Sequence, residues 1–210
     1  MQKVEIQLTL PNQLTLLRVV LAPVFLVLLH GESTFSKWMS LAVFIVAALT
    51  DWYDGWTARK FGYSSRLGKF FDPLADKILT SFALLAYVSL DLIDGWMVWI
   101  VIFRDFLITG LRTYAEYHDQ PIVTSKSAQA KTFGQFVVIY YILFLHVAKN
   151  TPSIYAEFPV TIDALMDSRV LFGMMLLVTL TTVGTGVAYL FDNRHHLKTM
   201  YDDLRSRHTA

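Results

Sequence analysis

The stretch Val170–Phe191 reads VLFGMMLLVTLTTVGTGVAYLF, and none of its residues carries a charge. A helix needs about 20 mostly apolar residues to cross the hydrocarbon core of a bilayer. This stretch meets that requirement more cleanly than any other part of the sequence. It therefore predicts a membrane-spanning helix and raises the question of whether other segments could also span a membrane.

Five earlier segments come close to the same length and composition. They are Leu14–Leu29, Trp38–Ala58, Pro73–Leu90, Trp96–Tyr114 and Phe133–Val147. Pro73 suits the first turn of a helix, so we expect the third helix to begin there. The sequence thus predicts an all-α integral membrane protein with six transmembrane helices. We expect one domain over residues 1–192 and a charged cytoplasmic tail over 193–210.

Composition supports this class and excludes others. Apolar residues make up 54% of the 210 residues and charged residues 17%, against about 25% charged in soluble domains. The net charge is +1 and no basic stripe is present, so nucleic acid is not an expected partner. The absence of cysteine excludes disulfides and thiolate metal sites. No cleavage signature follows Met1–Gln13, so we expect no removable signal peptide.

The distribution of Lys and Arg predicts the orientation, because cytoplasmic loops are enriched in both. With six spans and a cytoplasmic N-terminus, the outer regions hold only Lys37, Lys149 and Arg169. The inner regions hold many more: Lys3, Arg59, Lys60, Arg66, Lys69, Arg112, Lys126, Arg194, Lys198, Arg205 and Arg207. We therefore expect both termini, and any site at the inner ends of the helices, to face the cytoplasm.

Chemistry is concentrated in residues 51–76, DWYDGWTARKFGYSSRLGKFFDPLAD. Asp51 and Asp54 are three residues apart and Asp72 and Asp76 four, so each pair shares a helix face. We expect a loop of basic and small residues to join the two helices into an antiparallel hairpin. Four clustered carboxylates repel one another, and Mg²⁺ or Mn²⁺ would relieve that repulsion. The alternative is a set of solvated or ion-paired acids at two helix ends.

The complete pattern is more specific than its aspartates. It is D-x2-D-G-x2-A-R-x8-G-x3-D-x3-D, which resembles the signature of the CDP-alcohol phosphatidyltransferase family. The resemblance covers about residues 10–192. It implies a six-helix membrane enzyme, typically a homodimer, that transfers a phosphatidyl group from CDP-diacylglycerol to a hydroxyl acceptor and releases CMP.

The resemblance also implies roles for individual residues. All four aspartates would bind divalent metal, and Asp76 would in addition be the catalytic base for the acceptor hydroxyl. A base must lie near the attacking oxygen and not be fully committed to metal. The CDP-binding set would comprise Asp51, Asp54, Gly55, Ala58, Arg59, Gly68 and Asp72, with Asn12 and Thr15 as further contacts.

Three other stretches, Leu10–Phe25, Phe103–Arg112 and Lys131–Gln135, resemble the bacterial phosphatidylglycerophosphate synthases within that family. This resemblance implies glycerol 3-phosphate as acceptor and the bacterial inner membrane as location. The acceptor phosphate would be bound by Arg104, Arg112 and Lys131, since arginine can bond two phosphate oxygens at once. This chain has Asp105 where that group commonly has glutamate.

Alternatives remain for these basic and capping residues. Arg104 could pair with Asp105, and Arg112 and Lys131 could be ordinary positive residues of the inner face. Arg18 could extend to the interface instead of joining a polar site, and Asn12 and Thr15 could cap the first helix.

Other functions are also open. The same family could use serine, inositol phosphate, a choline-type alcohol or phosphatidylglycerol as acceptor. A small transporter is a remote alternative, although the chain lacks the internal repeats common in carriers. A scaffold protein would leave the clustered aspartates unexplained.

Overall fold

The computed structural model describes residues 10–61, 66–117 and 126–194. These residues form helices and no strands, which confirms the predicted all-α class. The helices are α1 (Leu10–His30), α2 (Thr34–Phe61), α3 (Arg66–Ser89), α4 (Gly95–Tyr117), α5 (Lys126–Lys149), α6 (Pro152–Glu157), α7 (Pro159–Leu165) and α8 (Ser168–Asp192).

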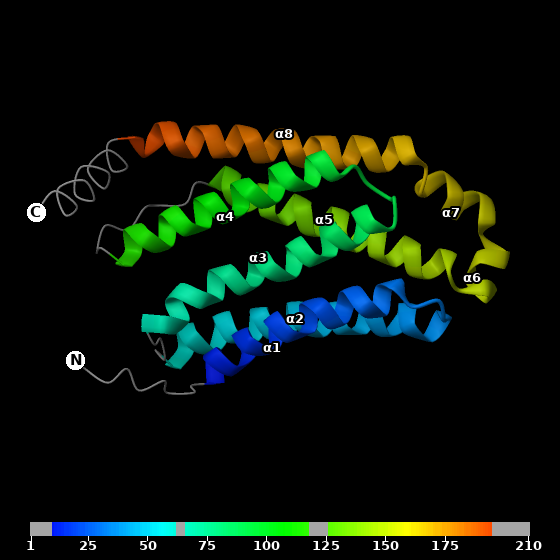
Figure 1. Ribbon diagram of the computed structural model, residues 1–210, viewed down its shortest axis with the longest axis horizontal. Coiled ribbons are helices and arrows are strands. Elements are labelled where there is room, and N and C mark those ends of the chain that lie inside the picture. Colours follow the sequence, from blue (N-terminus) through cyan, green and yellow to red (C-terminus); the bar gives the residue numbers. More distant parts are fainter. Residues whose placement is uncertain (1–9, 62–65, 118–125, 195–210) are drawn as a thin grey trace, which may run out of the picture.

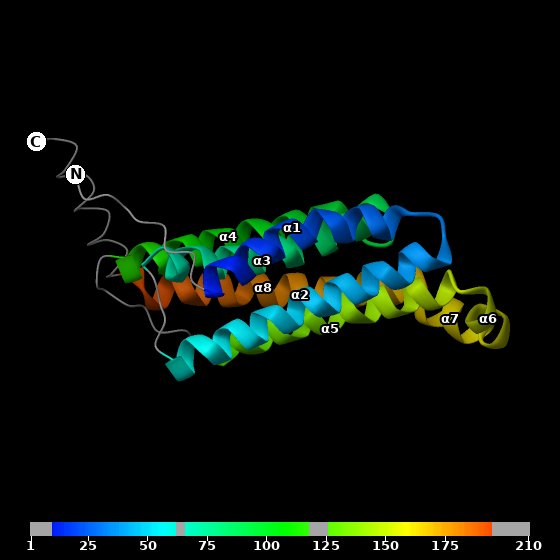
Figure 2. The same ribbon diagram turned by 90° about the horizontal axis from the view of Figure 1, so that it is seen from below.

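The six long helices run roughly along one axis as a bundle (Figure 1). α1 packs against α2 and α3, α4 packs against α3 and α8, and α5 packs against α8. α1, α3 and α5 begin at one end of the bundle, where α2, α4 and α8 finish, and a second view shows the same alternation (Figure 2). We call this the motif end, because the 51–76 motif lies there, and the opposite end the far end.

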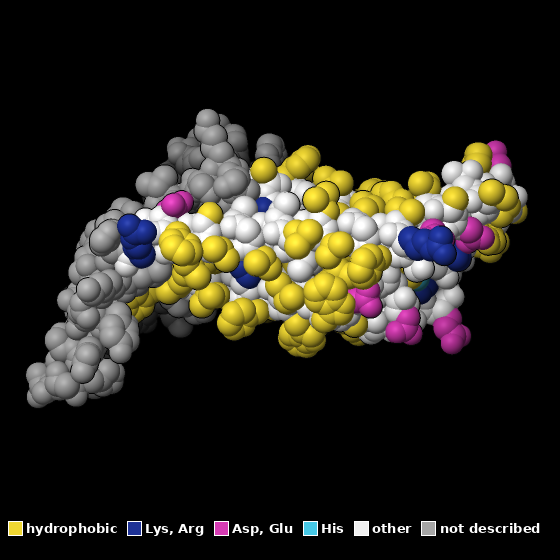
Figure 3. Space-filling model, turned by 90° about the horizontal axis from the view of Figure 1, so that it is seen from above, with side chains coloured by type: hydrophobic (Ala, Val, Ile, Leu, Met, Phe, Trp, Pro, Cys, Tyr) yellow, Lys and Arg dark blue, Asp and Glu magenta, His cyan; other side chains and the backbone are white. Residues whose placement is uncertain are grey.

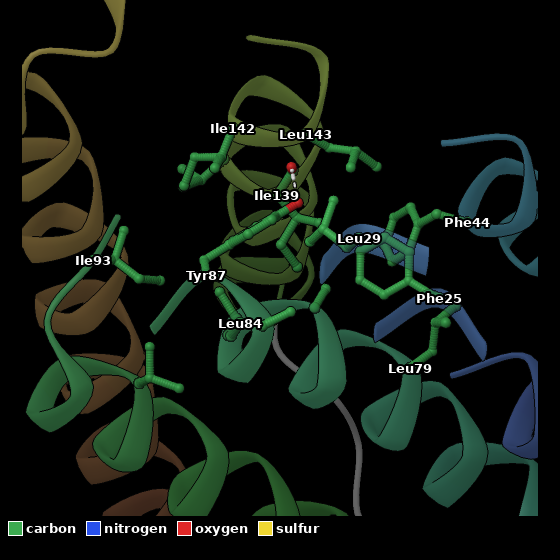
Figure 4. Close-up of a cluster of buried hydrophobic side chains, with 14 of the residues drawn as sticks. Phe25, Leu29, Phe44, Leu79, Leu84, Tyr87, Ile93, Ile139, Ile142 and Leu143 are labelled. Carbon is green, nitrogen blue, oxygen red and sulfur yellow. Dashed lines mark hydrogen bonds between the residues drawn. The ribbon is translucent and has the colours of Figure 1, made fainter. Parts of the chain in front are cut away.

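Buried apolar side chains from several helices form the core of the bundle (Figure 4). The rings of Phe25 and Phe44 lie 5.1 Å apart between α1 and α2. The Tyr87 hydroxyl of α3 donates to the Ile139 carbonyl of α5 at 2.8 Å. Because both groups of this bond are buried, it ties α3 to α5 without leaving a polar atom unpaired.

The flank of the bundle is apolar where it would meet lipid. The face over α8 shows hydrophobic side chains along its length, with most charged side chains toward the ends (Figure 3). Leu177 and Phe191 of α8 are 65% and 66% exposed. Among the described residues, Ala130–Lys149 and Pro159–Asp192 are long and apolar enough to cross a membrane. Shorter apolar helical stretches are Leu14–His30, Thr34–Thr50 and Lys77–Ser89.

Each of the six predicted segments corresponds to one long helix, but some expected details were wrong. Pro73 lies well inside α3, which begins at Arg66, so it does not mark the first turn. α2 ends at Phe61 and α3 begins at Arg66, so Arg59 and Gly68 lie on helices and not in the expected loop. Residues 62–65 between these helices lie outside the described residues. Asn12 and Thr15 fall within α1 and so do not cap it. The predicted tail beyond Arg194 is outside the described residues.

Two short helices, α6 and α7, were not expected. They lie at the far end between α5 and α8 (Figure 1). Prolines stand in the first turn of each, at Pro152 and Pro159, where the missing N–H costs nothing. The Lys149 ammonium donates to the Asp163 carboxylate at 2.8 Å, and the Tyr155 hydroxyl donates to its other oxygen at 2.7 Å. We call these three residues the exposed cluster, since Lys149 and Asp163 are half exposed.

Candidate active site

The aspartate motif is divided between two helices that meet at the motif end. Asp51 and Asp54 lie in the C-terminal part of α2, and Asp72 and Asp76 lie in the N-terminal half of α3 (Figure 1). The helical backbone places each pair on one face, as the spacing predicts. The side chains of the motif residues and of Asn12 lie outside the described part of the structure. The motif residues concerned are Asp51, Asp54, Gly55, Ala58, Arg59, Gly68, Asp72 and Asp76.

The donor chemistry of this motif suits a hard divalent cation. Four carboxylates carried by two adjoining helix segments supply only oxygen ligands, which Mg²⁺ and Mn²⁺ prefer. The side chains that the structure does describe contain no group of three acidic, histidine or cysteine residues that could hold a metal ion. A resident ion therefore fits the aspartate motif better than any described cluster.

A second polar group lies inside the bundle and centres on the carboxylate of Asp105. The Lys131 ammonium of α5 donates to its Oδ1 at 2.6 Å, and the Arg104 guanidinium approaches the same oxygen at 3.2 Å. The Lys77 ammonium of α3 lies 3.9 Å from Oδ2. We call these four residues the buried cluster. Three cations surround one carboxylate, so the formal net charge of the cluster is +2.

The buried cluster is enclosed by protein. The side chains of Asp105 and Lys131 are 3% and 1% exposed, and those of Arg104 and Lys77 are 13% and 19% exposed. Lys131 also donates to the Gln135 side-chain oxygen at 2.7 Å. Burying charges is costly, and such groups inside membrane proteins usually mark a functional site. The excess of positive charge makes this an attractive place for an anion.

The α8 helix is shaped to accommodate Arg104. The Arg104 guanidinium donates to the Thr185 hydroxyl at 3.0 Å. Gly186 provides the space, because a Cβ there would lie 3.1 Å from Cγ of Arg104 and 3.3 Å from its Nε. The Arg104 side chain therefore lies directly against the backbone of α8 and is fixed at both its stem and its tip.

Several buried polar atoms around this contact have no hydrogen-bond partner among the described residues. They are Nε of Arg104, Oδ2 of Asp105, and the hydroxyls of Thr182 and Tyr189. All belong to α4 or to the adjacent part of α8. Unsatisfied buried polar atoms are uncommon in native proteins and call for an explanation. A bound anion would satisfy the donors among them, which are Nε of Arg104 and the two hydroxyls, whereas Oδ2 of Asp105 faces the Lys77 ammonium at 3.9 Å.

The buried cluster adjoins the aspartate motif along α3. Lys77 directly follows Asp76 in the sequence, and consecutive Cα atoms are about 3.8 Å apart. The side chain of Lys77 reaches Asp105 on α4. The last aspartate of the motif and the cationic cluster are therefore neighbours in space.

The three basic residues expected to bind an acceptor phosphate are placed differently. Arg104 and Lys131 meet on Asp105, whereas Arg112 is exposed on α4, about 12 Å further along the helix by its rise per residue. The pairing of Arg104 with Asp105, considered above as an alternative, is present. It does not remove the capacity for an anion, because the cluster keeps its net positive charge.

Two other residues singled out in the sequence lie within the bundle. Thr15 is 6% exposed and Arg18 is 1% exposed. The Arg18 side chain is enclosed by protein, so the alternative in which it extends to the membrane interface is wrong.

A groove of about 540 Å³ opens beside the buried cluster, between α5 and α8. Its lining is mostly apolar and consists of Ala130, Lys131, Gly134, Val137, Val138, Met174, Leu177, Val178 and Thr181. Lys131 is the single charged residue among these. The groove therefore adjoins the cationic group from the flank of the bundle.

The sequence is also similar to known proteins. The sequence profile of the CDP-alcohol phosphatidyltransferase family matches residues 8–187. The chain belongs to the CDP-alcohol phosphatidyltransferase family. The match covers the aspartate motif on α2 and α3 and the buried cluster on α3, α4 and α5. Two of the apolar stretches in the described part of this chain are long enough to cross a bilayer.

Individual relatives carry a more specific name. A Bacillus subtilis (strain 168) protein is 33% identical over 202 residues, 90% of this chain and 97% of its own length. An Escherichia coli (strain K12) protein is 33% identical over 158 residues, 72% of this chain and 82% of its own length. A Rickettsia typhi protein is 32% identical over 130 residues, 62% and 73% of the two chains. All three are called CDP-diacylglycerol–glycerol-3-phosphate 3-phosphatidyltransferase.

Sequence reasoning missed part of the phosphatidyltransferase's buried cluster. Lys77 was not among the residues expected at the site, and the contacts of Gln135 and Thr185 were not foreseen. The spacing of Lys131 and Gln135 could have revealed their pairing, because residues four apart meet on a helix. Thr185 lies 81 residues from Arg104, and no local pattern signals such a contact.

Proposed function

We propose that the protein transfers a phosphatidyl group from CDP-diacylglycerol to glycerol 3-phosphate and releases CMP. The observation that carries this proposal is the buried cluster, whose net charge of +2 adjoins the aspartate motif through Lys77 and Asp76. An acceptor with a phosphate dianion matches that charge. The names of the relatives support the same acceptor.

Arg104 and Lys131 would hold the acceptor phosphate. Of the three ammonium protons of Lys131, two are directed at Asp105 and Gln135, which leaves one for a ligand. Arg104 has five N–H groups and directs two of them at Asp105 and Thr185, which leaves three. Hydrogen bonds between charged groups are about twice as strong as neutral ones. Arg112, exposed toward the motif end, would attract the acceptor as it enters.

The aspartates would serve the donor lipid. Asp51, Asp54, Asp72 and Asp76 would hold Mg²⁺ or Mn²⁺, which when bound would neutralise negative charge on the pyrophosphate of CDP-diacylglycerol. Gly55, Ala58 and Gly68 would let the nucleotide approach the helices closely, and Arg59, Asn12 and Thr15 would contribute further contacts. Asp76 would take the proton from the acceptor hydroxyl as that oxygen attacks phosphorus. Phosphoryl transfer depends mainly on such positioning and charge neutralisation.

We further propose six membrane spans with both termini, the motif end and the active site in the cytoplasm of a bacterium, and a homodimer as the working unit. The charges of the far end support the orientation, because its only Lys and Arg in the described residues are Lys37, Lys149 and Arg169. Reporter fusions that are active only outside the cell should stay silent at the C-terminus. An active fusion would mean an odd number of spans.

An acceptor panel tests the reaction. Purified protein is incubated with CDP-diacylglycerol, Mg²⁺ or Mn²⁺, and glycerol 3-phosphate, serine, inositol phosphate, a choline-type alcohol or phosphatidylglycerol, and CMP release is measured. Glycerol 3-phosphate should be the best substrate, and EDTA should abolish release until metal is restored. Preference for another alcohol would overturn the acceptor assignment, and full activity in EDTA would overturn the role given to the aspartates.

Two variants separate the roles within the motif. Asp76→Asn keeps the shape and one oxygen but cannot accept a proton, so kcat should fall by roughly 10²–10⁴-fold while CDP-diacylglycerol still binds. Asp54→Asn should instead weaken binding of CDP-diacylglycerol through loss of metal. Equal loss of lipid binding in both variants would count against the assigned division of labour.

A further inference from the structure

Asp105 is the one carboxylate in the buried cluster, and it contacts cations from three helices. Its Oδ1 accepts from Lys131 of α5 at 2.6 Å and from Arg104 of α4 at 3.2 Å, and its Oδ2 faces Lys77 of α3 at 3.9 Å. The proposed function assigns phosphate binding to Arg104 and Lys131 and assigns no role to the carboxylate of Asp105.

A negative charge beside an anion site requires a reason. The carboxylate repels an approaching phosphate, so electrostatics alone disfavours it there. Lysine and arginine, however, have long side chains with many rotamers, and fixing each side chain in one rotamer costs conformational entropy. A buried carboxylate bonded to both side chains fixes them before the ligand arrives, which reduces that cost of binding.

The geometry around Asp105 suits a group that fixes the side chains of Lys131 and Arg104 before the ligand binds. Gln135 holds Lys131 from one side and Thr185 holds Arg104 from another, so each cation has one contact to Asp105 and one to a neutral group. Both cations keep unused N–H groups, among them the buried Nε of Arg104. The carboxylate thus restricts the position of the two cations without consuming their capacity to bind an anion.

We propose that Asp105 is a positioning residue of the acceptor site, which holds Lys131 and Arg104 in the arrangement that receives the acceptor phosphate. This inference rests on the proposed function and deepens it. Asp105 acts through the two cations and does not itself touch the substrate.

The variant Asp105→Asn distinguishes a positioning residue from a mere counter-charge, because the two predict opposite signs. If Asp105 only balances charge, its removal raises the net charge of the cluster from +2 to +3 and lowers the KM for glycerol 3-phosphate. If Asp105 positions the cations, the KM for glycerol 3-phosphate rises roughly tenfold or more. The KM for CDP-diacylglycerol should stay within about twofold, since that substrate binds at the aspartate motif.

Conservative and control variants accompany this measurement. Asp105→Glu keeps a carboxylate that can still bond both cations, so it should recover most of the wild-type KM for glycerol 3-phosphate. Asp163→Asn removes a carboxylate that also accepts from a lysine and a second donor, but at the far end. It should leave both KM values unchanged.

If Asp105→Asn does not fold, the double variant Asp105→Asn with Lys131→Met replaces the measurement, since it removes both charges of the closest pair. If Asp105 acts by positioning Lys131, then removing Asp105 should matter little once Lys131 is gone. The KM of the double variant for glycerol 3-phosphate should therefore exceed the KM of Lys131→Met alone by much less than tenfold. A full additional tenfold rise would refute action through Lys131.

The two proposals fail in different ways. A wild-type protein that uses only uncharged acceptors overturns the proposed function and this inference together. A wild-type protein active on glycerol 3-phosphate, with an unchanged or lower KM in Asp105→Asn, leaves the proposed function standing and overturns the positioning role.

Discussion

The buried and exposed clusters are built from similar parts in different surroundings. In each, one aspartate accepts from a lysine and from a second donor: Asp105 from Lys131 and Arg104, Asp163 from Lys149 and Tyr155. The side chain of Asp105 is 3% exposed and that of Asp163 is 48% exposed. Water can replace every partner of Asp163 at little cost, whereas Asp105 depends on its protein partners.

The difference shows where charge serves function. A buried ion pair is seldom more stable than the apolar packing that could replace it. An exposed pair contributes little and is readily screened by salt. The exposed cluster needs no functional explanation, since it costs almost no stability. The buried cluster is costly, so its contribution to stability alone does not explain it. The predictions below test that contrast, from the largest expected effect to the smallest.

The largest effect is expected from Lys131→Met. The substitution keeps most of the length of the side chain but leaves Asp105 without its closest partner, and breaking a buried pair from one side costs about 3–5 kcal/mol. We expect a clear drop in Tm in detergent and a rise of roughly 100-fold in the KM for glycerol 3-phosphate. Thermal unfolding and initial rates of CMP release measure both. A variant that kept the wild-type Tm and KM would remove the distinction between the clusters.

A smaller effect is expected from Gly186→Ala. The added Cβ would lie 3.1 Å from Cγ of Arg104, whose far end is held by Asp105 and Thr185, so the side chain must shift by a few tenths of an ångström. We expect the KM for glycerol 3-phosphate to rise roughly threefold to tenfold, a binding loss of about 1 kcal/mol. The rate measured against acceptor concentration reports it.

Gly184→Ala is the matched control for that prediction. It lies on the same helix, and its Cβ would meet nothing within 4 Å. We expect wild-type kinetics and an equal or higher Tm, because alanine favours helix more than glycine does. If both alanine variants had the same KM, the fit between Gly186 and Arg104 would be irrelevant to acceptor binding.

The smallest effect is expected from Lys149→Met. It removes the lysine of the exposed cluster and so parallels Lys131→Met, but water can replace the lost contact to Asp163. Tm and both KM values should match those of the wild type within error, at low and at high salt. A loss comparable to that of Lys131→Met would show that exposure does not explain the contrast.

The helices were predictable because each apolar segment is long and bounded by charged or turn residues. Their ends were less so. Pro73 falls inside α3 because the helix extends outward through Arg66 into residues that are not apolar. α6 and α7 were missed because each is shorter than two full turns, too short for an apolar period to emerge.

The site was predictable where the residues are close in sequence. The two aspartate pairs follow from helical spacing, whereas Arg104 and Lys131 are 27 residues apart and were expected together only from the resemblance to the synthases. The shared carboxylate of Asp105, the approach of Lys77 and the space at Gly186 depend on how α3, α4, α5 and α8 pack together. Such contacts between distant segments have no periodic signal in a single sequence.

The separation of Asp105 from Lys131 along the chain also bears on how the protein is made. During synthesis α4 emerges with Arg104 and Asp105 about 26 residues before Lys131 appears on α5. Each such charge at the centre of a helix opposes insertion into a bilayer by about 2.5–3.5 kcal/mol. In the six-span arrangement proposed above, we expect a nascent chain that stops before α5 to insert α4 poorly, which a glycosylation-tag insertion assay would detect. α4 would then settle in the membrane only with α5, so the two helices would enter the bilayer as one unit.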